Sequence, residues 1–198
     1  FSYQSGKFER FTTQDNLTSD MLLSLFEDRE GSLWVGTEGR GLNHYRDGLF
    51  TNLGLAQGLT HEIALGLLED HQKRIWVATF GGGLNRFDDS GVKTWTTRDG
   101  LVKNAILPLH QASDGSIWLG TWGAGLQSLR NNTFSTYTTD QGLAHNKVRT
   151  ITELRDGSTF VGTNHGASII RNGHFETSPL TDALTDDKVM VLLQDPDG

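Results

Sequence analysis

The chain has 198 residues, a formal net charge of −7 and no cysteine. The acidic balance argues against a nucleic-acid-binding protein, whose surface is basic, and the lack of cysteine excludes disulfides and thiolate metal sites. A content of 24 glycines with 35% hydrophobic residues is typical of a turn-rich, all-β protein, and no segment is long and apolar enough for a membrane-spanning helix.

Two short segments at the start of the chain are predicted to be strands. Phe1-Ser2-Tyr3 matches the end of the third strand of the repeat unit described below, and Phe8-Glu9-Arg10-Phe11 matches its fourth strand. Residues 1–14 are therefore expected to be the end of a preceding unit.

A five-residue motif recurs through the rest of the chain at a constant spacing. Its aromatic residue stands at positions 34, 76, 118 and 160, always 42 residues apart. The copies are Leu33-Trp34-Val35-Gly36-Thr37, Ile75-Trp76-Val77-Ala78-Thr79, Ile117-Trp118-Leu119-Gly120-Thr121 and Thr159-Phe160-Val161-Gly162-Thr163. A fixed period in this range indicates stacked copies of one supersecondary unit. We divide the array, residues 1–198, into units at 15–56, 57–98, 99–140 and 141–181.

The second unit shows what one copy contains. Four short strand patterns are expected over residues 63–68, 75–79, 84–87 and 92–95, and we name these strand positions A, B, C and D. Four antiparallel strands in about 42 residues are typical of the blade of a β-propeller. The sequence thus predicts an all-β propeller with four complete blades and parts of others, either incomplete or completed by assembly.

Two features orient the predicted blade. Pro108 falls in the A segment of the third unit, and proline is tolerated only at the edge of a sheet. Position A is therefore expected to be the innermost strand, beside the axial channel. The aromatic residue of position B is expected to pack between blades as core, which we favour over a ligand-stacking row. The threonine that ends each motif is expected to bond a neighbouring loop through its hydroxyl.

Strand reversal places the B–C and D–A loops on one face of such a propeller. Residues that differ between copies on these loops are not explained by packing, so binding is expected there. Phe80 and Trp122 stand among glycines, where a ring is placed to stack on a sugar, a peptide or a partner domain; capping of the channel mouth is the alternative. In the fourth unit the B–C loop is one residue shorter, 164–166 against 122–125. The candidate ligand- or partner-binding residues are Glu38, Arg40, His61, Phe80, Trp122, His145, Asn164 and His165.

Catalytic and metal-binding patterns are weak. The sequence contains no Gly-x-Ser-x-Gly motif, and its glycine runs are not followed by a helix pattern, so they predict turns rather than phosphate-binding loops. His61, His145 and His165 are positioned to converge from different blades, but solvated loop histidines are the simpler interpretation. We expect no enzyme activity, no cofactor and no metal.

The end of the chain is predicted to begin another blade. Residues 188–193 match position A a fifth time, and Asp195-Pro196-Asp197-Gly198 matches the A–B turn. Residues 182–198 are therefore expected to be the start of a further blade. Unpaired edges promote association, so we expect further blades or self-association through the incomplete ends.

The repeat resembles a known family. The segments Glu27-Asp28-Arg29-Glu30-Gly31-Ser32-Leu33-Trp34-Val35-Gly36-Thr37 and Gly39-Arg40-Gly41-Leu42-Asn43, with the equivalent residues 111–121, are similar to the two-component regulator propeller repeat. This resemblance implies the periplasmic or extracellular sensor region of a membrane-anchored bacterial receptor, a hybrid histidine kinase or a diguanylate cyclase. It implies no catalytic residues.

We therefore expect a sensor module that binds a small molecule, a glycan or a protein domain on the face formed by the B–C and D–A loops. No nucleic acid and no direct membrane contact are expected. Two alternatives remain open. One is a propeller lyase of the streptogramin-lyase type using His61, Glu62 and His145; the other is a passive protein-interaction scaffold.

Overall fold

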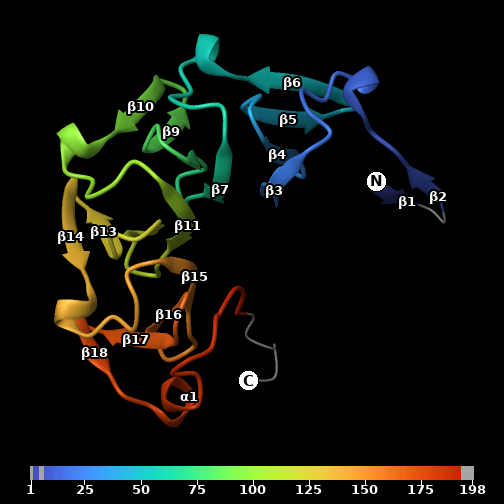
Figure 1. The fold of residues 1–198 in the computed structure, drawn as a ribbon. Coiled ribbons are helices and arrows are strands. Elements are labelled where there is room, and N and C mark those ends of the chain that lie inside the picture. The colour runs from blue at the N-terminus through green and yellow to red at the C-terminus, as the bar shows by residue number, and fades with distance from the viewer. Residues whose placement is uncertain (1, 5–6, 193–198) are drawn as a thin grey trace.

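A computed structural model describes residues 2–4 and 7–192 and contains four antiparallel four-stranded sheets arranged in an open arc (Figure 1). Each sheet is one predicted blade, with its strands in chain order. Blades 1 and 2 contain β3 (Leu22–Glu27), β4 (Leu33–Thr37), β5 (Leu42–Arg46), β6 (Leu49–Leu53), β7 (Ala64–Glu69), β8 (Ile75–Thr79), β9 (Leu84–Asp88) and β10 (Gly91–Trp95). Blades 3 and 4 contain β11 (Ile106–Gln111), β12 (Ile117–Thr121), β13 (Leu126–Arg130), β14 (Thr133–Tyr137), β15 (Val148–Glu153), β16 (Thr159–Thr163), β17 (Ala167–Arg171) and β18 (His174–Glu176). The propeller-type fold predicted from the 42-residue period is confirmed.

Position A is the innermost strand, as predicted. β7 packs against β3 and β11, and β11 packs against β15, so these four strands line the inside of the arc (Figure 1). In β11 the pairing register shifts between Ile106 and Leu109, the place where Pro108 stands. The proline therefore lies at a free edge and at an interruption of the hydrogen-bonded ladder.

The aromatic residue of position B is core in every blade. Trp34 and Trp118 are 8% exposed, Trp76 is 3% exposed and Phe160 is fully buried. These rings pack between blades: Trp76 shares one hydrophobic cluster with Ile106 and other residues of blade 3. This apolar burial, about 1.5–3 kcal/mol for a large side chain, holds each blade to the next.

The motif threonine closes the loop that follows it. The hydroxyls of Thr37, Thr79 and Thr121 donate to the carbonyls of Gly41, Gly83 and Gly125 at 2.7–2.9 Å. Thr163 makes the same bond to Gly166 at 2.8 Å. A buried polar group needs a partner, and here the partner fixes the shape of the B–C loop.

The D–A connections contain short helical turns that the strand pattern of the repeat does not predict. These are η1 (Thr13–Asp15), η2 (Leu55–Gln57), η3 (Thr97–Asp99), η4 (Thr139–Gln141) and the helix α1 (Pro179–Asp182). At η1, η3 and η4 a threonine caps the turn and an Asp or Gln three residues later reaches back to it, which is the capping-box pattern. None of the helices in the described ranges is long and apolar enough to cross a membrane.

The N-terminal end of the chain agrees with the prediction of two successive strands, whereas the C-terminal end differs from it. β1 (Ser2–Gln4) and β2 (Lys7–Glu9) pair as a hairpin, whereas Phe1 lies outside the described residues. Residues 188–192 form no strand, and residue 193 with the turn at 195–198 lies outside the described range. The amide of Val189 still donates to the carbonyl of Thr163 at 3.0 Å, so this segment lies where the next innermost strand is expected. It is not a strand because no second strand of the described chain pairs with it.

Candidate functional site

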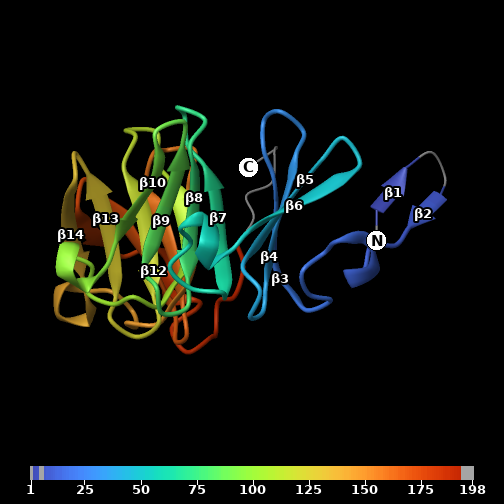
Figure 2. The same ribbon diagram turned by 90° about the horizontal axis from the view of Figure 1, so that it is seen from above.

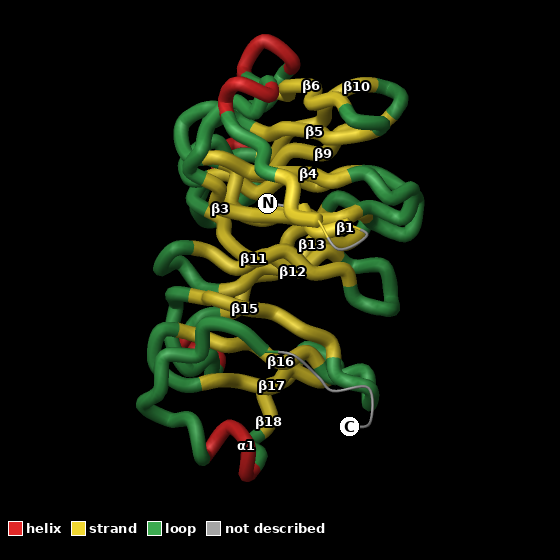
Figure 3. The backbone as a smooth tube through the Cα atoms, turned by 90° about the vertical axis from the view of Figure 1, so that its right-hand side faces the viewer, coloured by secondary structure: helices red, strands yellow, loops and turns green. Residues whose placement is uncertain are grey.

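The B–C and D–A loops meet on one face, as strand reversal predicts. The amide of Gly41 donates to Glu62 O at 2.8 Å, and that of Gly125 donates to Asn146 O at 2.8 Å. Each bond joins the B–C loop of one blade to the D–A loop of the next. The loops gather at two opposite ends of the strands (Figures 2 and 3). We name the end that carries these bonds the site face; it contains the loops at 38–41, 80–83, 122–125 and 164–166.

The shortened loop of blade 4 is also where the sequence placed it. Residues 164–166 separate β16 from β17, whereas residues 122–125 separate β12 from β13. The shorter loop keeps its bond to the following segment, because the amide of Gly166 donates to Asp187 O at 2.8 Å. One residue is therefore removed without loss of the joint between neighbouring units.

Phe80 and Trp122 are brought together on the site face. Their ring centroids are 5.7 Å apart with an interplanar angle of 86°, the edge-to-face geometry that aromatic pairs favour. Phe80 is 39% exposed and Trp122 is half-buried. They come from the loops of blades 2 and 3, so the pair spans a joint between blades and keeps ring surface open to solvent.

Two basic side chains, one next to and one in the innermost strand of blade 4, lie over the ring of Trp122. Nζ of Lys147 lies 3.1 Å and Cζ of Arg149 lies 4.6 Å from the indole ring centroid. Arg149 donates from Nε to Oδ1 of Asn164 at 2.7 Å, which fixes the guanidinium. Cations over an aromatic face are stabilised by about 0.5–1 kcal/mol when exposed.

Lys103 and Lys188 add further positive charge. Nζ of Lys103 donates to the carbonyl oxygen of Trp122 at 2.6 Å. Partial burial lowers the pKa of the Lys147 amine below its usual range, and repulsion from Arg149 and Lys188 lowers it further. The site face thus has a positively charged aromatic cluster built from blades 2 to 4.

Two of the three histidine candidates, His145 and His165, are brought together, and no ring contact joins His61 to them in the described part of the chain. The rings of His145 and His165 are 5.1 Å apart, and Nδ1 of His145 accepts from the amide of Lys147 at 2.9 Å. Nδ1 of His61 accepts from the amide of Ile63 at 3.1 Å. Among residues 2–4 and 7–192, no group of three or more His, Cys, Asp and Glu side chains is arranged to hold a metal ion.

Two of the remaining candidate residues lie on a blade that does not contribute to the cluster. Glu38 and Arg40 are exposed on the loop of blade 1, whereas the cluster is formed by blades 2 to 4. Lys147 and Arg149 were not among the predicted site residues. A signal for them was present: at their positions the other three blades carry apolar residues, and both basic residues lie in or next to the innermost strand of blade 4.

Comparisons with known proteins agree with the fold. Residues 16–39 match the family model described as the two component regulator propeller. No curated protein matches the chain. The extracellular domain of the putative hybrid two component system BT4673 from B. thetaiotaomicron is similar in structure, with a TM-score of 0.72, 17% identity, and coverage of 86% of this chain and 25% of that one.

Two further structures share the fold. The extracellular domain of the putative hybrid two component system BT3049 from B. thetaiotaomicron has a TM-score of 0.57 and 22% identity over 84% of this chain and 29% of that one. Virginiamycin B lyase from Staphylococcus aureus has a TM-score of 0.66 and 13% identity over 80% of this chain and 56% of that one. The chain spans 25% and 29% of the lengths of the two sensor domains. At these identities the likeness concerns the fold.

Proposed function

We propose that the chain is part of the sensor region of a membrane-anchored bacterial receptor, and the match of residues 16–39 to the two component regulator propeller model supports this. The chain lies on the periplasmic or extracellular side and binds a ligand or partner domain on the site face. The BT4673 and BT3049 structures, described as extracellular domains of two-component systems, support this assignment. The signalling activity of the receptor and the nature of its ligand are parts of this proposal.

The observation that carries the proposal is the pair Phe80 and Trp122. The loops that hold these rings are glycine-rich, and the equivalent residues of blades 1 and 4 are Glu38 and Asn164. The repeat therefore does not need an aromatic ring at this position. A half-exposed edge-to-face pair offers a flat apolar surface to a sugar ring or an apolar side chain. Binding removes this apolar surface from water, which lowers the free energy of the complex.

The test replaces both rings in the full-length receptor, as Phe80→Ala/Trp122→Ala. We expect the concentration of inducing ligand needed for half-maximal response to rise at least about tenfold, equivalent to about 1.4 kcal/mol of lost binding free energy. Phe50→Ala is the matched control: it removes a half-buried ring of β6 that packs on Tyr45. A double variant that is expressed normally and responds like the unaltered receptor would contradict the proposed site.

A propeller lyase is the second candidate. The similarity to virginiamycin B lyase covers 80% of this chain, and His145 lies beside His165 on the site face. The discriminating assay measures turnover of quinupristin, the compound present in a structure of virginiamycin B lyase, by the purified chain with and without a chelator. Turnover that disappears in the chelator and in His145→Ala/His165→Ala would favour the lyase over the sensor.

We also propose that further blades cover the free inner strand of blade 1. β3 leaves Leu22 51% exposed and Leu25 69% exposed, and Met21 before it is 62% exposed. The equivalent strand of blade 3 packs against a neighbour on both sides. Solution size measurement tests the competing idea of self-association: a concentration-dependent dimer would show that a second copy covers this strand instead.

A further inference from the structure

The positive charges on the site face are gathered without compensating carboxylates. Lys103, Lys147 and Arg149 all approach Trp122, and Lys188 lies close enough to repel the amine of Lys147. None of the four forms an ion pair with a carboxylate of the described chain. The chain as a whole has a formal charge of −7, so the cluster does not reflect the general composition.

The repeat shows that the fold does not require two of these charges. Lys147 and Arg149 each stand at a position that is apolar in the other three blades. Those residues are Met21, Ile63 and Ala105 at the first position and Leu23, Leu65 and Leu107 at the second. Blade 4 therefore places two cations where the fold accepts an aliphatic side chain.

The placement has an energetic cost. Like charges at close range repel, and partial burial disfavours the charged form of an amine, which is why the pKa of Lys147 is lowered. Arg149 uses Nε for Asn164, but the guanidinium has four further N–H donors in a planar fork that fits an oxyanion. A costly arrangement that the fold does not need indicates a role in binding.

Space for a ligand is present beside the cluster. Arg149 lines a hollow of about 410 Å³ between the innermost strands, together with Leu65, Leu67, Leu107 and Leu109. Ligand sites occupy about 300–1,000 Å³ and combine apolar walls with a few polar groups. Arg149 therefore connects an apolar hollow to the aromatic pair on the site face.

We propose that the site face takes a small ligand bearing an oxyanion group, such as a carboxylate or a sulfate. Lys147 and Arg149 bind the oxyanion, and the ring or apolar body of the ligand lies against Phe80 and Trp122. This inference rests on the proposed function, because it names the class of ligand for the same site.

The test uses the purified chain and a matched pair of probes, glucuronate and uncharged glucose. Binding is followed by the NMR signal of the Trp122 indole N–H. The variant Lys147→Ala/Arg149→Leu introduces residues that blade 3 already carries at these positions, so its melting temperature is expected to stay unchanged. Arg46→Ala/Lys73→Ala removes the same charge from the opposite ends of the strands, where both cations pair with Glu30.

We expect glucuronate to shift the signal saturably, glucose to shift it at least about tenfold more weakly, and added salt to weaken the glucuronate effect. The Lys147→Ala/Arg149→Leu variant should lose at least about tenfold in glucuronate affinity, and the control variant should bind like the unaltered chain. Any of three results overturns the inference. Glucuronate and glucose bind equally, the Lys147→Ala/Arg149→Leu variant binds glucuronate as tightly as the control variant, or glucuronate causes no shift. If the receptor response fails in Phe80→Ala/Trp122→Ala and persists in Lys147→Ala/Arg149→Leu, the proposed function stands and only the oxyanion assignment falls.

Discussion

Two regions of the molecule combine basic and aromatic side chains, and they differ in how the charges are compensated. The first is a groove of about 490 Å³ between blades 2 and 3, lined by Arg74, Arg86, Lys93, Trp76 and Trp95 among others. The second is the cluster on the site face. By composition alone, either region would qualify as an anion site.

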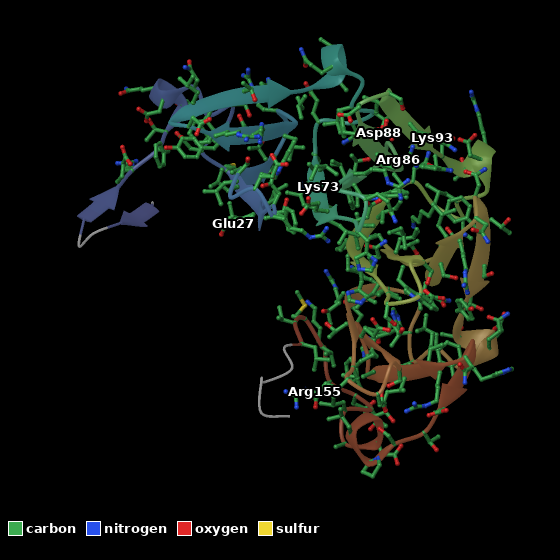
Figure 4. All side chains as sticks on the ribbon, turned by 180° about the vertical axis from the view of Figure 1, so that it is seen from behind. Glu27, Lys73, Arg86, Asp88, Lys93 and Arg155 are labelled. Carbon is green, nitrogen blue, oxygen red and sulfur yellow. The ribbon has the colours of Figure 1, made fainter. Side chains whose placement is uncertain are left out.

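In the groove the arginines are paired and the rings are covered. Arg74 bonds Asp70 at 2.5 Å, and Arg86 bonds Asp88 at 2.7 Å; Figure 4 shows Arg86, Asp88 and Lys93 on blade 2. Trp76 and Trp95 stack with their centroids 5.2 Å apart and are only 3% and 4% exposed. The two rings pack blade 2 against blade 3, and the two ion pairs neutralise the arginines within blade 2.

On the site face the cations lack carboxylate partners within the described ranges, and the aromatic rings are partly exposed. Lys147 and Arg149 have no carboxylate partner in the described ranges, and Phe80 keeps 39% of its surface exposed. Burial and pairing, rather than residue type, separate a structural cluster from a binding cluster.

The largest expected difference is in stability. Trp76→Ala should lower the free energy of unfolding by about 3–5 kcal/mol, because it leaves a cavity between blades. Trp122→Ala should cost about 1 kcal/mol, the value of an exposed aromatic pair. Urea denaturation of the two variants measures this. Similar losses would mean that the ring on the site face is as structural as the ring in the groove.

A smaller effect is expected at the buried carboxylate of the groove. Asp70 accepts from Nε1 of Trp76 at 2.7 Å and from the amides of Gln72 and Arg74 at 2.9 and 3.0 Å. Burial alone would raise the pKa of Asp70, but these bonds and the Arg74 charge outweigh it and lower the pKa. At neutral pH, Asp70→Asn should cost about 1.5–3 kcal/mol, the value of hydrogen bonds to a charged group.

The pH dependence of that variant has a definite sign. A carboxylate with a lowered pKa in the folded state stabilises the protein above its unfolded pKa, and this stability is lost as the pH falls through the folded value. The difference between the unaltered chain and Asp70→Asn should therefore shrink as the pH falls below about 4. Asp28 is the control, because it bonds Trp34 in the same way without an arginine; Asp28→Asn should cost less. A gap that stays constant down to acidic pH would contradict this assignment.

Much of the fold could be predicted from the sequence because each blade repeats the same local pattern. The second strand of blade 2 was placed without error at residues 75–79, since a buried Trp and a following Thr mark it. The helical turns before each innermost strand were missed, although Thr96 and Asp99 carry a capping-box pattern. The expected strand at residues 188–193 was wrong over its described part, because a strand needs a partner that periodicity alone does not supply.

The site was predicted in part. Phe80 and Trp122 could be found because they interrupt glycine-rich loops, and the structure brings them into contact. Lys147 and Arg149 could not be found in the same way, because variation on exposed loops predicts binding residues, whereas Arg149 lies in β15. Comparing that strand with its three sister strands reveals the substitution, but only the structure shows that both cations lie over Trp122.

The most direct test of the account is an NMR titration that follows the indole N–H signals of the five tryptophans with glucuronate. We predict that the Trp122 signal shifts saturably while the signals of Trp34, Trp76, Trp95 and Trp118 stay in place, because those rings are buried between blades. Movement of Trp95 with Trp122 unchanged would place the anion in the groove between blades 2 and 3, and would contradict the claim that the site face binds the ligand.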